Sequence, residues 1–264
     1  MIVKMADNLA EVQLKLVRAE KHLHEALGLI SKFAEGECTI ALEADDDRKM
    51  YVQRIRLSPN ASPEISAVAG DFFGNVRAAL DYIVTQLVLA NGHVPTKANA
   101  FLIADDPGTF EEYSSRRLKG ISPKAAALIE SLQPYKRRDN PLGILNRLVN
   151  IDKHHSLNVI TVVADNTDVV AMSGNFSMFL GNEELRDGTI FGGIGLPFHL
   201  AARHFPTFNE RLPTMKMHGK CSLFVAFDDP SAEELENFRV DRTLEGILEF
   251  MRNVVVPAFE PFFD

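Results

Sequence analysis

Residues 62–92, SPEISAVAGDFFGNVRAALDYIVTQLVLANG, predict one long amphipathic helix, and this helix decides the fold. Ser62-Pro63 places a hydroxyl at the N-cap and a proline at the first helical position, and Asn91-Gly92 ends the helix. Gly70 and Gly74 would let another helix approach closely. The apolar residues that recur at helical spacing and form one stripe are Ile65, Val68, Phe72, Val76, Leu80, Ile83 and Leu87.

Helical spacing predicts further helices on either side of this one. Those with long apolar stripes cover residues 6–35, 142–156 and 242–256, and two shorter helices cover residues 108–118 and 123–131. Long helices with one apolar face each bury that face against one another, so we expect about four longer helices to form a bundle.

Strand patterns interrupt the helices in two places. Two short runs on either side of an acidic turn predict an N-terminal β-hairpin over residues 37–57. Residues 157–228 contain several β-rich runs, which predict a small antiparallel segment inserted before the C-terminal helix at 242–256. We therefore expect an α+β protein with a helical part at 1–156, all within a single domain spanning residues 1–264.

The composition excludes several classes of protein. The 264 residues are 46% hydrophobic and 24% charged, which is atypical of disordered or fibrous chains. The net charge of −8 argues against a nucleic-acid binder that is basic over its whole surface. No apolar run approaches the roughly 18 residues of a membrane span. Cys38 and Cys221 lie far apart, and no secretory signal is evident, so we expect a cytoplasmic protein with free thiols that does not bind membranes.

The densest polar cluster in an apolar context lies at residues 146–155, NRLVNIDKHH. On a helix, Arg147, Asn150 and His154 share one stripe, at positions i, i+3 and i+7. An arginine and a histidine placed in this way can address one phosphate, since the arginine neutralises charge and the histidine moves a proton. The alternative is a solvated helix end, where a histidine is favoured by the helix dipole.

A second polar group lies on the long helix at residues 62–92. Arg77 and Asp81 form an oppositely charged pair at i, i+4, and their neighbours in sequence are apolar. A partly buried pair needs further polar partners, and Asp152 and His155 would supply them if the two helices pack. The alternative is a surface ion pair worth roughly 0.3–0.5 kcal/mol.

Three stretches near these clusters resemble known proteins: NVRAALDY at 75–82, KGISPKAAALIESLQPY at 119–135 and LNRLVNIDKH at 145–154. They are similar to a family of uncharacterised bacterial proteins with an N-x-D-K-H helix. This resemblance covers about the middle third of the chain and implies no activity. A bundle with an Arg-x6-His helix also resembles, more loosely, HEPN-type proteins, many of which are dimeric, metal-independent endoribonucleases with this motif at the dimer interface.

The HEPN resemblance implies roles for the first polar cluster. Arg147 would stabilise a phosphate, His154 would act as general acid or base, and Asn150 would assist. The resemblance also implies RNA as the partner and a homodimer as the working form. Similar spacings occur at Arg18–His24, on the first predicted helix, and at Arg211–His218, where Pro213 favours a loop.

A local excess of positive charge lies between Tyr113 and Arg138, where seven basic residues accompany one acidic residue. Such a tract attracts polyanions, and it ends just before the Arg147 helix. The alternative is a solvated helical face or an ion-pair surface for an acidic partner region. The basic residues expected to hold RNA are Arg116, Arg117, Lys136, Arg137 and Arg138.

Two hypotheses of different class follow. The first is a HEPN-like RNA-binding protein or endoribonuclease that uses no cofactor, because no zinc, P-loop or dinucleotide motif is present. The second is a non-catalytic interaction module in which Arg77, Asp81, Asp152 and His155 form a buried polar network that fixes the packing of the helices.

Overall fold

In the computed structural model, the chain forms two compact units. The helical unit comprises Met1–Leu27, Glu64–Leu157 and Val240–Asp264, and the β unit comprises Gly28–Pro63 and Asn158–Arg239. Helices and antiparallel strands are both present, which confirms the α+β class. The residues whose structure is described are 9–33, 35–47, 50–58, 61–136, 140–154, 157–163, 169–173, 176–180, 188, 196–197, 216–228 and 238–263.

We predicted a single domain over residues 1–264, whereas the chain divides between two units because strands distant in sequence pair with each other. β1 (Glu35–Asp45) pairs antiparallel with β7 (Lys216–Phe227), in a register that includes Glu35 opposite Ser222. This pairing joins the N-terminal strands to the later β-rich segment. The helices before, between and after these segments form the other unit.

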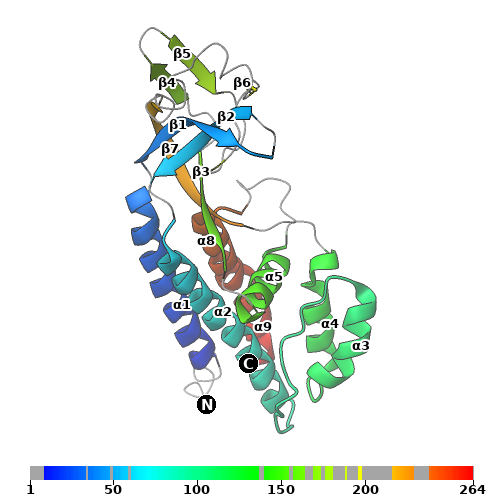
Figure 1. The fold of residues 1–264 in the computed structure, drawn as a ribbon. Coiled ribbons are helices and arrows are strands. Elements are labelled where there is room, and N and C mark those ends of the chain that lie inside the picture. Colours follow the sequence, from blue (N-terminus) through cyan, green and yellow to red (C-terminus); the bar gives the residue numbers. More distant parts are fainter. Residues whose placement is uncertain are drawn as a thin grey trace. The chain divides into compact units, whose positions relative to one another are not determined.

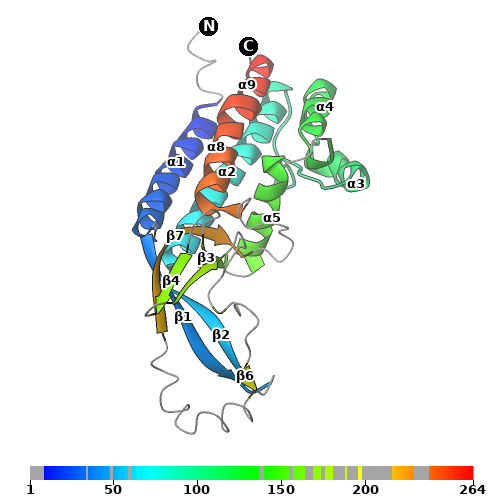
Figure 2. The ribbon, with the colours of Figure 1, turned by 90° about the horizontal axis from the view of Figure 1, so that it is seen from above.

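The helical unit contains the long helices and two shorter ones (Figure 1). In Figure 1 and in Figure 2, α1, α2 and α8 lie side by side. The bounds are α1 (Ala10–Ile30), α2 (Pro63–Ala90), α3 (Pro107–Arg117), α4 (Pro123–Ser131), α5 (Pro141–His154), α8 (Val240–Phe250) and α9 (Val256–Phe259), with a π-helical turn at Met251–Val255 and 3-10 turns at Ser31–Phe33, Pro134–Lys136 and Glu260–Phe262.

α2 has the limits and the apolar stripe that its sequence predicts. Every residue of the predicted stripe is buried, and Phe72 and Phe73 are fully buried. The helix ends in a Schellman motif, because Gly92 adopts a φ of +76° and the His93 N–H donates to the Val88 carbonyl at 3.0 Å. α2 therefore forms the centre of the helical core.

Two helix ends differ from the prediction. α1 ends at Ile30 rather than near residue 35, because the chain enters the β1 ladder at Glu35. The C-terminal helix continues past Pro257, which we expected to close it. Proline lacks an N–H, and its ring clashes with the carbonyl four residues earlier. The π-helical turn resolves this conflict, since the Val256 N–H donates to the Met251 carbonyl, five residues back.

The described strands of the β unit pair in the order β5-β4-β7-β1-β2-β6, and β3 also pairs with β7. All of these pairings are antiparallel. The sequence predicts strands at residues 159–163, 176–180 and 222–227; β3 and β5 have the predicted bounds, whereas β7 starts earlier, at Lys216. The remaining bounds are β2 (Met50–Ser58), β3 (Val159–Val163), β4 (Val169–Ser173), β5 (Phe176–Leu180) and β6 (Leu196–Pro197).

β2 presents a charged face and an apolar face, as its alternating sequence predicts. Ile55 and Leu57 are buried. Arg54 donates to Asp45 at 2.9 Å, and Arg56 forms two hydrogen bonds with Glu43, at 3.0 and 2.7 Å. These cross-strand ion pairs fix the register of β1 on β2, because a slip of one residue would reverse both faces.

Within the helical unit, one bidentate ion pair joins α1 to the π-helical turn at Met251–Val255. Arg252, in the π-helical turn, donates to both carboxylate oxygens of Glu20 on α1, at 2.7 and 2.8 Å. This hydrogen bonding holds the pKa of Glu20 below its usual value of 4.5. The same contact raises the pKa of Arg252.

The Glu20–Arg252 pair predicts a specific pH dependence. A carboxylate with a lowered pKa in the folded state stabilises the protein above its unfolded pKa, and this contribution is lost as the pH falls through the folded pKa. In chemical denaturation, the wild type should be more stable than Glu20→Gln between about pH 6 and 8. The difference should shrink below about pH 4.5. A difference that stays constant into this acidic range would contradict the assignment.

Candidate functional site

α5 carries the predicted catalytic stripe, and its start is fixed by a buried asparagine. The Leu142 N–H donates to the Asn140 side-chain oxygen at 2.9 Å. The Asn140 amide donates in turn to the Leu132 carbonyl at 2.7 Å. Pro141, which has no N–H to satisfy, occupies the first helical position. The start of α5 is thus attached to the end of α4.

The two sides of α5 differ sharply. Its buried residues are Leu142, Leu145, Leu148 and Val149. With about 3.6 residues per turn, positions 147, 150 and 154 lie on the side away from these leucines. Arg147 is half-buried, and Asn150 is exposed. His154 is the last residue of α5, and its side chain lies outside the described residues. We call Arg147, Asn150 and His154 the outer stripe of α5.

Asp152 lies on the opposite side of α5, against α2. A Cβ at Gly70 would lie only 2.9 Å from the Asp152 Oδ1 atom. Glycine at this position therefore admits the carboxylate where any larger residue would displace it. The predicted close approach at Gly70 thus has a specific occupant, whereas a Cβ at Gly74 would meet nothing within 4 Å.

Arg77 and Asp81 meet each other and the backbone of the loop that follows α2. The Arg77 Nη2 atom lies 3.2 Å from the Asp81 Oδ1 atom and donates to the Phe101 carbonyl at 2.6 Å. The Phe101 N–H donates to the same Asp81 oxygen at 2.8 Å. Phe101 is fully buried and packs edge-to-face on Phe259. The pair therefore satisfies the polar backbone of a buried loop residue.

The structure brings together only part of the predicted polar network. Asp152 lies at Gly70, and Gly70 and Asp81 are eleven positions apart on α2, or about 16 Å along the helix axis. Asp152 therefore does not join the Arg77–Asp81 pair, whose described partner is Phe101. His155 lies outside the described residues.

The described basic residues proposed to hold RNA lie in two places. Arg116 is exposed and Arg117 is half-buried, both in the last turn of α3. Lys136 follows α4, with its Nζ atom 3.3 Å from a Glu130 oxygen and 5.2 Å from the Tyr135 ring centre. Arg137 and Arg138 lie outside the described residues.

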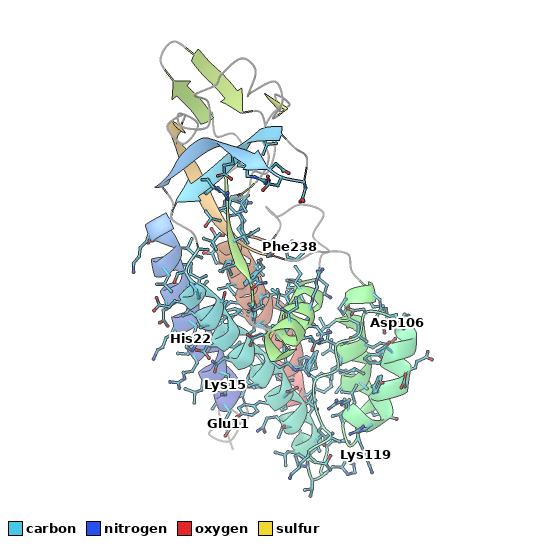
Figure 3. The ribbon with its side chains drawn as sticks, in the orientation of Figure 1. Glu11, Lys15, His22, Asp106, Lys119 and Phe238 are labelled. Carbon is cyan, nitrogen blue, oxygen red and sulfur yellow. The ribbon has the colours of Figure 1, made fainter. Side chains whose placement is uncertain are left out.

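Acidic residues just before the basic tract lower the net charge of this region. Residues 105–138 contain five acidic and seven basic side chains, so the net charge of this segment is only +2. Asp106 caps α3 by accepting from the Thr109 N–H at 2.9 Å, and these hydrogen bonds, chiefly that from the Thr109 hydroxyl, lower its pKa. Figure 3 shows Asp106 and Lys119 at opposite ends of α3. This separation follows the helix dipole, with acids at the amino end and bases at the carboxyl end.

One buried side chain that positions this region was absent from the sequence predictions. Gln133 is fully buried and accepts from the Ala104 N–H at 2.7 Å. Its amide donates to the carbonyls of Leu102 and Ile129, at 2.8 and 2.9 Å. All the polar atoms of its amide group are thus used to hold the 101–104 segment on α4. A single glutamine in a helix-end sequence gives no signal of such a role.

Comparisons with protein-family models, with curated proteins and with solved structures find no match to this chain. Among the described residues, no helix is long and apolar enough to cross a membrane. Within the same part of the chain, no group of three or more His, Cys, Asp or Glu residues is placed to hold a metal ion. The functional assignment therefore depends on the geometry of the outer stripe of α5.

The contact between Gly70 and Asp152 predicts different effects of two similar substitutions. Gly74→Ala should raise the free energy of unfolding by about 0.5–1 kcal/mol, because alanine favours a helix interior and no atom stands in its way. Gly70→Ala should raise it less, because the exposed Asp152 carboxylate must move aside for the methyl group. The added substitution Asp152→Ala should restore the full gain. Equal stabilisation by the two alanines in urea denaturation would contradict the contact.

Proposed function

We propose that this chain is a HEPN-like, cytoplasmic RNA-binding protein and metal-independent endoribonuclease, in which a helical bundle works as a homodimer. The observation that carries the proposal is the outer stripe of α5. Arg147, Asn150 and the position of His154 lie on the side of the helix away from its buried leucines. A polar stripe on that side can meet a ligand without unfolding the core.

The residues of the outer stripe supply what RNA cleavage without a metal requires. The 2′-hydroxyl of RNA attacks the adjacent phosphorus, an O2′–P bond forms and the P–O5′ bond breaks. His154 would remove the proton of the attacking hydroxyl or deliver a proton to the leaving oxygen. Arg147 would stabilise the charge that develops on the phosphate, and Asn150 would donate a hydrogen bond to it. The products are a 2′,3′-cyclic phosphate and a 5′-hydroxyl.

Basic residues outside α5 would hold the RNA backbone. Arg116 is exposed at the carboxyl end of α3. We propose that it acts with Arg117, Lys136, Arg137 and Arg138. Because the net charge of residues 105–138 is only +2, only a few phosphates would be contacted. Binding should therefore depend on salt less steeply than in strongly basic RNA-binding proteins.

Cleavage of a single-stranded RNA in the presence of EDTA tests the proposal. Arg147→Ala and His154→Ala should each lower the rate by about 100-fold or more, the usual contribution of such groups. The control is Lys32→Ala, which removes an exposed basic residue outside the outer stripe and should leave the rate unchanged.

The cleavage products and a modified substrate separate this chemistry from contamination. An RNA with 2′-O-methyl groups should resist cleavage, because it lacks the nucleophile. The proposal fails if the purified protein cleaves no RNA, if cleavage requires a divalent metal, or if Arg147→Ala and His154→Ala behave like Lys32→Ala.

A second candidate is the non-catalytic interaction module, and the contacts at Phe101 favour it. Arg77 and Asp81 bind the backbone of a buried loop residue, which is a structural role. On this hypothesis the polar clusters determine the packing of the helices, and the chain acts by presenting that surface to a partner.

The Phe101 contacts predict a loss of stability that is separate from activity. Asp81→Ala leaves the Phe101 N–H without its acceptor and should cost about 1–3 kcal/mol of unfolding free energy. Asp81→Asn keeps an oxygen at this position and should cost clearly less. RNA cleavage per folded molecule should be unchanged in both variants. Equal stability of the alanine and asparagine variants in thermal unfolding would contradict the role of Asp81.

A further inference from the structure

The side of α1 that faces away from the helical core carries exposed apolar residues. The buried residues of α1 are Val12, Leu16, Ala19, Leu23 and Ala26. On the opposite side, the side chain of Leu14 is 62% exposed and that of Val17 is 42% exposed. In Figure 1 and Figure 2, α1 lies at the edge of the helical unit, and among the described residues no other helix of that unit lies beyond it.

The exposed residues on this side follow the spacing of a helix–helix interface. They recur at intervals of four and three, which is the heptad pattern that places one stripe against a second helix. Leu14 and Val17 occupy the centre of the stripe. Its described members, all exposed, are Ala10, Leu14, Val17, Lys21 and His24.

The charges beside this stripe are complementary to a second copy in the antiparallel orientation. Glu11 and Arg18 each follow a stripe residue directly, so both occupy the same flanking edge, and both are exposed. Figure 3 shows Glu11 near the amino end of α1. If two copies pack antiparallel with Leu14 against Val17 of the partner subunit, Glu11 lies beside Arg18 of the partner subunit. The twofold axis repeats each of these contacts.

We propose that this face of α1, made by Ala10, Glu11, Leu14, Val17, Arg18 and Lys21, is an interface with a second copy of this chain. The two α1 helices pack antiparallel about a twofold axis, with Leu14 and Val17 at the centre and a Glu11–Arg18 ion pair at each end. This interface specifies the homodimer of the proposed function and rests on it; because sedimentation measures association alone, a failure of the interface is distinguishable from a failure of RNA cleavage. A single helix face is smaller than the roughly 800 Å² per partner of a standard interface, so the dimer dissociates in the micromolar range.

Charge reversal with rescue tests the interface by sedimentation equilibrium of the full chain, from about 1 μM to about 1 mM. The wild type should dimerise. Glu11→Arg and Arg18→Glu should each raise the dissociation constant at least tenfold, because like charges then meet at both ends. The double variant Glu11→Arg/Arg18→Glu should restore the dimer. An equimolar mixture of the two single variants should form a heterodimer, since one copy then carries two arginines and the other two glutamates.

Two further variants separate this face from the rest of the surface. Leu14→Asp should abolish the dimer, whereas Leu89→Asp, at a 49% exposed leucine on α2, should not. Circular dichroism checks that each variant keeps its helices. A monomeric wild type over this whole concentration range overturns the proposal. So does a dimer that both single reversals leave intact, or one that the double reversal fails to restore.

Discussion

The burial of α2 along most of its length is the constraint on which the helical unit depends. Its buried residues lie on several sides of the helix and include two adjacent phenylalanines, Phe72 and Phe73. A helix in this position can carry a polar side chain only where that side chain finds a partner. Arg77 and Asp81 find theirs in the backbone of Phe101, which closes the loop after α2 against the core. At Gly70, α2 has no side chain and so leaves room for the Asp152 carboxylate from α5.

The position of α5 follows from the same constraint. Its leucines are buried, and Asp152 at its carboxyl end lies against Gly70 of α2. At its amino end, Asn140 attaches the helix to the end of α4. A helix held at both ends in this way has one orientation about its own axis, and this orientation turns Arg147 and Asn150 away from the buried leucines. The proposed chemistry depends on that orientation.

Local signals in the sequence predict local features accurately. The limits of α2, its apolar stripe and its glycine end are correct because each depends on a few neighbouring residues, such as Ser62-Pro63 and Asn91-Gly92. The strands β3 and β5 are correct for the same reason. The continuation of the last helix past Pro257 was missed, because a π-helical turn has no clear signal in the sequence.

Features that depend on distant residues could not be predicted. Arg77 and Asp81 were recognised as a partly buried pair, yet their partner is a backbone group about twenty positions later that no side-chain pattern marks. The two-unit organisation depends on the pairing of β1 with β7, which are separated by most of the chain. The basic tract at residues 113–138 has a net charge of +6, but acidic residues just before it lower the net charge of residues 105–138 to +2.

In the proposed function, RNA contacts the outer stripe of α5. Thiol labelling of Asn150→Cys tests it most directly, in a background where Cys38 and Cys221 are replaced by serine, with RNA saturation followed by fluorescence anisotropy. We expect rapid labelling without RNA and at least tenfold slower labelling with it, while the exposed control Lys32→Cys is labelled at the same rate in both conditions. Equal labelling of Asn150→Cys with and without saturating RNA, or no RNA binding at all, would contradict the account.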